Sequence, residues 1–245
     1  MVGEHARSVR EALKLRRHIH LEPRVQGLQP AAASRRFPSY LAPAMTQLPE
    51  LPLTLSRQEI RKMIRQRRRT LTPEQQQEMG QQAATRMMTY PPVVMAHTVA
   101  VFLSFDGELD TQPLIEQLWR AGKRVYLPVL HPFSAGNLLF LNYHPQSELV
   151  MNRLKIHEPK LDVRDVLPLS RLDVLITPLV AFDEYGQRLG MGGGFYDRTL
   201  QNWQHYKMQP VGYAHDCQLV EKLPVEEWDI PLPAVVTPSK VRSEE

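Results

Sequence analysis

Short apolar runs alternate with amphipathic segments through most of this chain, a pattern that predicts an α/β protein. Six apolar runs have the length and composition of buried strands, at residues 99–103, 125–129, 138–143, 172–177, 211–214 and 234–237. An amphipathic helix that opens at Asp110 and ends near Gly122 separates the first two runs. This order favours a right-handed βαβ unit. We therefore expect a mainly parallel sheet flanked by helices, in a Rossmann-like, three-layer, single domain.

Two further helices are predicted ahead of the first strand. Ser56 followed by Glu59 forms a capping box, which begins the first of them. Thr72 caps the second helix with Pro73 at its first position, and this helix continues to about Thr89 before a pair of prolines. The domain is therefore expected to carry N-terminal helices.

Arginines form a stripe along the first of these helices. Spacings of four, four and three residues place four of them on one face: Arg57, Arg61, Arg65 and Arg68. Like charges at this spacing repel, so the stripe indicates an anion opposite it. A solvated basic face is the alternative interpretation, and the sequence does not decide between the two.

The positive charge of the chain is concentrated at its beginning. The total is +4, whereas residues 1–44 alone hold eight Lys or Arg and three Glu, so the remainder is close to neutral. A near-neutral body argues against a dedicated nucleic-acid binder, because such a protein carries its basic surface on the folded domain. We expect residues 1–44 to be a basic leader and residues 45–245 to be the α/β domain. The leader is interpreted first as an extension that adds nothing to the fold, with a targeting peptide and a basic interaction arm as alternatives.

Membrane and redox signals are weak along the whole sequence. No uninterrupted apolar run approaches the roughly 20 residues of a spanning helix, and no apolar signal core opens the chain. Cys217 is the single cysteine, so neither an intramolecular disulfide nor a thiolate zinc site is expected. We predict a cytoplasmic protein with no membrane partner.

The strongest chemical signal is a glycine-rich segment, RLGMGGGFYDR at residues 188–198, between a strand-like run and a helix expected over about 194–203. Glycines leave backbone N–H groups unshielded, so such a loop can surround phosphate groups. The P-loop and dinucleotide patterns both fit poorly, because Phe195 and Tyr196 stand where those motifs need other residues. An ordinary surface turn is the competing interpretation.

Two acidic residues add to this picture. Asp197 follows the glycines, and a carboxylate beside bound phosphates indicates a divalent cation between them, although a first-turn acid also favours the helix dipole. Glu108 lies in the loop after the first predicted strand, and loops at the carboxyl ends of parallel strands gather at one edge of a sheet. We expect both loops to face one cleft, with an exposed loop acid as the alternative for Glu108.

Residues from about Ser56 to Pro238 resemble the 5-formyltetrahydrofolate cyclo-ligase family, also called 5,10-methenyltetrahydrofolate synthetases. The most specific element is the glycine segment, residues 186–198. Supporting elements are Arg57 with Ile60 and Arg61, the run 102–104 leading to Glu108, and residues 224–229 before the last predicted strand. Residues ahead of Met45 have no counterpart in this pattern.

The resemblance implies an ATP- and Mg²⁺-dependent ligase of one-carbon metabolism. In this reaction ATP phosphorylates the formyl oxygen of 5-formyltetrahydrofolate, N10 attacks the activated carbon, and loss of phosphate gives 5,10-methenyltetrahydrofolate. The protein supplies alignment and charge neutralisation, which dominate phosphoryl transfer.

The resemblance also implies a role for particular residues. Arg188 and Asp197 would be catalytic, and Asp197 and Asp229 would serve Mg²⁺. ATP would be bound by Arg57, Arg61, Arg188, Leu189, Gly190, Met191, Gly192, Gly193, Gly194, Phe195 and Tyr196. The folate would be bound by Leu103, Glu108, Met191, Gly192, Gly193, Gly194 and Phe195.

Two other function classes stay open on the sequence. One is a folate- or nucleotide-binding regulatory protein with little turnover, and the other is an RNA-binding module that uses the basic N-terminal segments. Five histidines, at positions 131, 144, 157, 205 and 215, lack metal-ligand spacing and are expected in loops or at the surface. We expect the protein to act on small molecules as a monomer.

Overall fold

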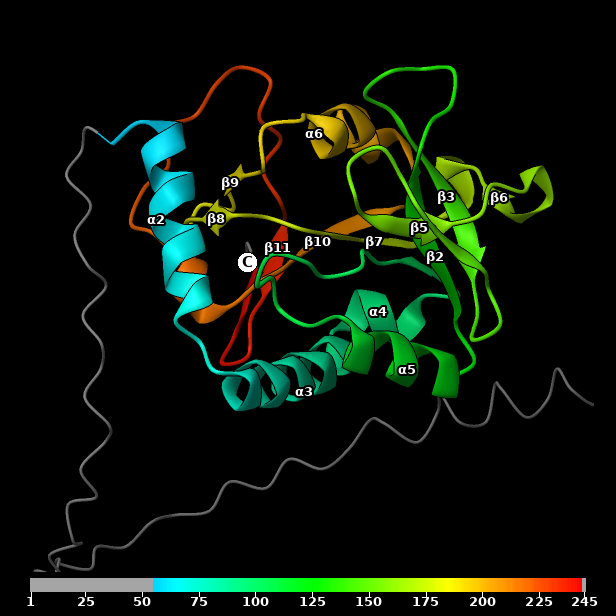
Figure 1. The fold of residues 1–245 in the computed structure, drawn as a ribbon, viewed down its shortest axis with the longest axis horizontal. Helices are drawn as coiled ribbons and strands as arrows, with labels where there is room; N and C mark the ends of the chain where they lie inside the picture. The colour runs from blue at the N-terminus through cyan, green and yellow to red at the C-terminus, as the bar shows by residue number, and fades with distance from the viewer. Residues whose placement is uncertain (1–54, 244–245) are drawn as a thin grey trace, which may run out of the picture. The chain divides into compact units, whose positions relative to one another are not determined.

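The computed structural model describes residues 55–243, and its centre is an eight-stranded sheet in the order β12-β11-β10-β7-β1-β2-β3-β6 (Figure 1). Its strands are β1 (Thr98–Ala100), β2 (Arg124–Leu130), β3 (Leu138–Tyr143), β6 (Val166–Leu167), β7 (Val174–Thr177), β10 (Gln209–Tyr213), β11 (Ala234–Val236) and β12 (Val241–Ser243). The five strands β11, β10, β7, β1 and β2 pair in parallel, and β3 and β12 pair antiparallel to their neighbours. The predicted mainly parallel α/β sheet is confirmed.

Helices cover both faces of this sheet (Figure 1). They are α2 (Arg57–Arg69), α3 (Pro73–Thr89), α4 (Pro91–Met95), α5 (Gln112–Arg120) and α6 (Phe195–Leu200), with 3₁₀ turns η1 (Val163–Asp165), η2 (Leu169–Arg171), η3 (Trp203–His205) and η4 (Asp216–Gln218). Helices α3, α4 and α5 lie on one face, and α6 lies on the other. The expected three-layer arrangement therefore holds for this part of the chain.

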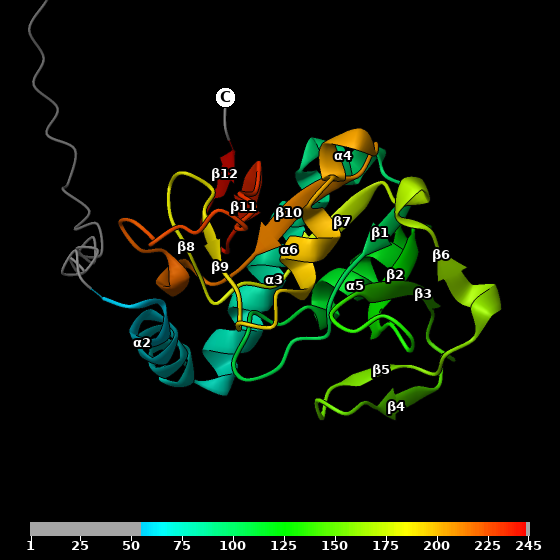
Figure 2. The ribbon, with the colours of Figure 1, turned by 90° about the horizontal axis from the view of Figure 1, so that it is seen from above.

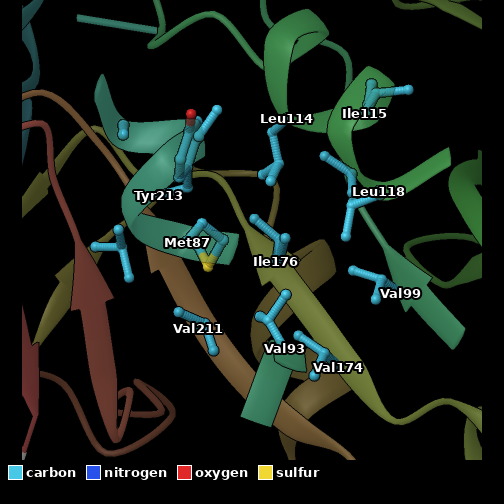
Figure 3. Packing of buried hydrophobic residues seen from close by; sticks show 14 of the residues in the cluster. Met87, Val93, Val99, Leu114, Ile115, Leu118, Val174, Ile176, Val211 and Tyr213 are labelled. Atoms are coloured by element: carbon cyan, nitrogen blue, oxygen red, sulfur yellow. The ribbon is translucent and has the colours of Figure 1, made fainter. Parts of the chain in front are cut away.

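The apolar periodicity of these elements explains how the layers adhere. Figure 3 shows Met87 of α3 and Leu114 and Leu118 of α5 over Ile176 and Val211 of the central strands. All five side chains are fully buried. At roughly 25 cal/mol per Å² of apolar surface, burying each of them contributes about 1.5 to 3 kcal/mol, which offsets the entropy of ordering the chain. The second apolar cluster, with Phe140 and Leu175 among its members, fills the opposite face.

The N-terminal helices begin as their sequences predict. Ser56 accepts a hydrogen bond from the backbone N–H of Glu59, whose carboxylate accepts one from the Ser56 N–H in return. Thr72 and Gln75 make the same reciprocal pair at the start of α3. Helix α2 packs beside the hairpin of β8 (Ala181–Phe182) and β9 (Arg188–Leu189), as Figure 2 shows.

Several elements differ from the prediction. The helix expected over about 194–203 ends at Leu200, and the strand expected to be the last is followed by β12. The hairpin of β4 (Leu149–Met151) and β5 (His157–Pro159) was not predicted, because half-exposed three-residue strands carry little apolar periodicity. The predicted leader, residues 1–44, lies outside the described residues.

Candidate active site

A cavity of about 600 Å³ opens where the parallel strands end. Its walls come from α2, the loop after β1, the β4–β5 hairpin and the glycine segment after β9. The lining side chains are largely apolar, and the polar groups among them are few. The predicted shared cleft is therefore present, with Glu108 on one side and the glycine segment on another.

The glycine segment lies against the cavity as bare backbone. Gly192 and Gly194 have positive φ angles of 103° and 65°, which L side chains rarely adopt, and Gly194 caps α6. A Cβ at Gly193 would lie 2.8 Å from the Phe195 ring. Arg198 closes the outside of the loop by donating to the carbonyl oxygen of Gly193 at 2.6 Å. The loop is thus conformationally constrained, and its role as a phosphate cradle stays a prediction.

The arginine stripe of α2 is turned toward the protein. The guanidinium of Arg57 pairs with both carboxylate oxygens of Asp229 and donates to the carbonyl oxygen of Pro224 at 3.1 Å. Arg65 lies 3.3 Å from the Asp106 carboxylate. The anions opposite the stripe are therefore, first of all, the protein's own carboxylates, and the solvated-face interpretation is wrong.

Arg61 occupies the position where the stripe meets the glycine segment. Its Nε donates to the carbonyl oxygen of Gly190 at 2.8 Å, and the far end of its guanidinium lies 3.8 Å from where a Cβ at Gly192 would stand. Burial lowers the pKa of Arg61, and the neighbouring charges of Arg57 and Arg65 lower it further. An added anion would relieve this repulsion, so the site suits a phosphate group.

Arg188 and Asp197 form an ion pair across the mouth of the glycine segment. Arg188 is 4% exposed, and burial lowers its pKa although Asp197 and Asp229 oppose that effect. Both residues line the cavity, as do Phe195 and Tyr196. The structure thus brings the two predicted catalytic residues into direct contact. Leu189 is buried in the apolar cluster under α2 and is absent from the cavity lining.

Glu108 is the buried carboxylate of the cavity, with 6% of its surface exposed. Its Oε2 accepts a hydrogen bond from the Phe105 N–H at 3.2 Å, and its Oε1 lies 4.0 Å from Arg68. Burial raises the pKa of Glu108 to about 7 and outweighs these two favourable contacts. The exposed-loop interpretation of Glu108 is wrong, because this side chain is buried.

The two carboxylates predicted for Mg²⁺ differ in their surroundings. Asp197 lines the cavity and is 20% exposed, so it fits a cation carried in by phosphates. Asp229 is 5% exposed, and both of its oxygens accept hydrogen bonds from Arg57. Among residues 55–243 no group of three His, Cys, Asp or Glu is placed to hold a metal. A cation here would therefore depend on ligands from the nucleotide.

Some site residues escaped the sequence interpretation. The β4–β5 hairpin supplies Asn152, Leu154, Ile156 and His157 to the cavity wall, and no motif or periodicity marks them in the sequence. His215 was expected in a loop or at the surface; it lies in the short loop between β10 and η4, but its side chain is buried, with 1% of its surface exposed. The His215 ring lies close to the backbone of Gly107 and Glu108, in the loop after β1.

Comparison with known proteins identifies the family of this chain. The model of the 5-formyltetrahydrofolate cyclo-ligase family matches residues 54–238, which include all the cavity walls. The chain belongs to this family. A 5-formyltetrahydrofolate cyclo-ligase of Escherichia coli strain K12 is 99% identical over 179 residues, which are 73% of this chain and 98% of that protein. One from Haemophilus influenzae is 53% identical over 73% of this chain and 96% of its own length.

Solved structures place the fold in the same family. The 5,10-methenyltetrahydrofolate synthetase of Aquifex aeolicus superposes with a TM-score of 0.67 at 28% identity, over 77% of this chain and 93% of that one. The predicted family and its class of enzyme, a cyclo-ligase, are confirmed. Within residues 55–243 no helix is both long and apolar enough to cross a bilayer.

Proposed function

We propose that this cyclo-ligase converts 5-formyltetrahydrofolate to 5,10-methenyltetrahydrofolate with ATP and Mg²⁺, releasing ADP and phosphate. The observation that carries the proposal is the cavity itself, in which a glycine cradle flanked by Arg61 and Arg188 faces the buried carboxylate of Glu108. One end suits a polyphosphate and the other a neutral heterocycle with N–H donors.

The chemistry needs the formyl oxygen to become a leaving group. Transfer of the terminal phosphoryl group of ATP to that oxygen forms an O–P bond and breaks the bond to ADP. N10 then forms a bond to the formyl carbon and gives up its proton, and phosphate departs with the former formyl oxygen to leave the methenyl bridge. Placing both substrates in one enclosed cavity supports this sequence, because alignment and exclusion of water lower the barrier to group transfer.

The nucleotide end of the cavity is assigned to cationic and backbone groups. Arg61 and Arg188 would neutralise phosphate charge, and the glycine segment, residues 190–194, would let backbone N–H groups approach the phosphates. Arg57 would reach the phosphates only by exchanging its bond to Asp229. Mg²⁺ would offset the remaining phosphate charge, with Asp197 as its protein ligand in the cavity wall. Asp229 stays the second predicted Mg²⁺ ligand, and it would first have to give up its bond to Arg57.

The folate end of the cavity is assigned to Glu108 and the apolar walls. An ionised Glu108 would accept hydrogen bonds from pterin N–H groups, and Leu103 and Phe105 would pack on the flat ring. Met191 and Phe195 lie between the two ends and would contact both ligands. The expected cytoplasmic location and monomeric state stay predictions.

The test is the appearance of the methenyl chromophore in purified protein supplied with 5-formyltetrahydrofolate. We expect product only when ATP and Mg²⁺ are both present, in a 1:1 ratio to the ADP released. Binding of folate without product would instead support the regulatory alternative. Salt-sensitive RNA binding without folate uptake would support the RNA-binding alternative, although the inward-facing arginines of α2 speak against it.

A further inference from the structure

A buried arginine lies behind the folate end of the cavity. Arg68, in the last turn of α2, is 0% exposed, and none of its three guanidinium nitrogens has a hydrogen-bond partner in residues 55–243. It is absent from the cavity lining. Its nearest anions are Asp106 Oδ2 at 3.6 Å and Glu108 Oε1 at 4.0 Å. Arg68 is therefore held by charge attraction rather than by hydrogen bonds.

The position of Arg68 in the helix is one that apolar residues normally take. Ile60 and Ile64 form the buried stripe of α2, and Arg68 follows at the next spacing of four. Burying a guanidinium without hydrogen bonds costs several kcal/mol, and a methionine of similar length would avoid that cost. Fold stability alone does not explain the choice of arginine here.

The groups around Glu108 come from four elements. Arg65 and Arg68 of α2 and the N–H of Phe105 favour its charged form, whereas burial and Asp106 disfavour it. Tyr196 of α6 lies near enough for Glu108 to raise the pKa of its hydroxyl, and His215 lies near Arg68, which helps burial keep that ring neutral. Arg68 makes the closest ion pair of Glu108. Its removal would leave the carboxylate almost isolated in an apolar wall.

We propose that Arg68 is a positioning residue for folate capture: from behind the cavity wall, its guanidinium holds the Glu108 carboxylate charged and turned toward the ligand. Arg68 does not touch the substrate, and its effect passes entirely through Glu108. Helix α2 would then serve both ends of the cavity, with Arg61 at the nucleotide and Arg68 behind the folate. This inference rests on the proposed function for the identity of the ligand.

The test compares wild type with Arg68→Met, Arg68→Lys and the control Arg67→Met, which removes an equal charge from the same turn of α2. Calorimetry gives the Kd of 5-formyltetrahydrofolate between about pH 6 and about pH 9, a range that spans the titration of Glu108. At about pH 6, where Glu108 is mostly protonated, we expect Arg68→Met to weaken binding about tenfold, which is the effect of raising the pKa of Glu108 by one unit. The deficit should shrink as pH rises, because Glu108 then ionises without help.

Three further readouts separate positioning from a structural role. Arg68→Lys should keep most of the affinity for 5-formyltetrahydrofolate. The KM for ATP should stay within about twofold of wild type in all variants. In the double variant, Arg68→Met should add nothing to the loss of folate affinity caused by Glu108→Gln. The far-UV spectrum of each variant, recorded at every pH, separates a loss of capture from a loss of fold. A pH-independent deficit, or one equally large in Arg67→Met, would overturn the inference. If Arg68→Met fails to fold, Arg68→Lys still tests the idea, since loss of affinity at every pH in a folded lysine variant contradicts it.

Failure of the proposed reaction and failure of the Arg68 role give different results. If wild type binds 5-formyltetrahydrofolate but makes no product, the proposed reaction fails while the role of Arg68 in capture is still measured by Kd. If wild type forms product and the affinity of Arg68→Met is unchanged at every pH, the reaction stands and the positioning role fails.

Discussion

Replacing Glu108 by glutamine should stabilise the protein at neutral pH while impairing folate binding. Glu108 is an acid whose pKa in the folded protein, about 7, lies above its ordinary value of 4.5, because burial disfavours the charged form. Such a group binds a proton more tightly in the folded state than in the unfolded state. Between pH 4.5 and about pH 7 the folded protein therefore keeps a proton on Glu108 that the unfolded chain has lost. Stability is therefore lost as pH rises through this window, and the cost is fully present above it.

The size of this cost follows from the shift. Each pKa unit corresponds to 1.36 kcal/mol, so a rise from 4.5 to about 7 makes the ionised Glu108 cost roughly 3 kcal/mol above neutral pH. This is a large share of the 5 to 15 kcal/mol that stabilises a typical domain. The attraction of Arg68 is already contained in this value, because Arg68 is among the groups that lower the pKa. A neutral glutamine avoids the cost and can still accept the hydrogen bond from Phe105.

The assay is urea unfolding of Glu108→Gln and wild type at about pH 5 and about pH 8. We expect the variant to gain little at the lower pH and roughly 2 to 3 kcal/mol at the higher one. Glu116→Gln is the matched control, because Glu116 is 43% exposed and contacts Arg120 and Gln112 on the surface of α5. It should change stability by less than about 1 kcal/mol at either pH.

Folate binding should weaken in Glu108→Gln, although the folded state becomes more stable. Glu108→Gln should raise the KM for 5-formyltetrahydrofolate at least about tenfold, the value of one charge-assisted hydrogen bond, and leave the KM for ATP unchanged. A variant that is equally destabilised at both pH values would refute the reasoning, since Glu108 would then belong to a satisfied structural ion pair. A defect confined to ATP affinity would show that the folate end of the cavity is misassigned.

Three further changes test other parts of the site and fold. Asp197→Asn should lower Mg²⁺-dependent turnover by a factor on the order of 100 with an unchanged far-UV spectrum, and normal turnover would remove Asp197 from the metal site. Arg61→Gln should raise the KM for ATP roughly tenfold and spare the KM for folate, as steady-state kinetics with each substrate varied would reveal. Gly186→Ala should cost about 2 kcal/mol or more in urea unfolding, because φ is +73° and a Cβ would lie 2.3 Å from the carbonyl oxygen of Leu232. Gly122→Ala, with φ at +71° and open space around it, should cost only about 1 kcal/mol, and equal losses would contradict the steric argument.

Local sequence rules predicted the elements that frame the site. The capping boxes at Ser56 and Thr72 begin α2 and α3, and the pattern around residues 110–122 contains α5. These features depend on hydrogen bonds between residues three or four apart, so the sequence contains all the information they need. The glycine segment is similar, because glycine adopts the positive φ angles of Gly192 and Gly194 more readily than residues with side chains.

Other features depend on partners that are distant in the sequence. The arginines of α2 share one face by helical period, but Asp229 and Asp106, which lie far along the chain, decide that this face is turned inward. The β4–β5 hairpin enters the cavity wall without any periodic signal of its own. Arg68 follows Ile60 and Ile64 at helical spacing, yet an arginine in a run of arginines gives no sign that it is buried.

The sequence by itself determined the class of fold, the starts of the N-terminal helices, the place of the glycine segment and the family, because periodicity, caps and close-spaced motifs act over a few residues. Only the tertiary structure decided which carboxylates meet which arginines, and that Glu108, Arg68 and His215 are removed from water together. Burial and charge pairing are properties of neighbours in space, so the ionisation of Glu108 is set by packing that no local pattern encodes.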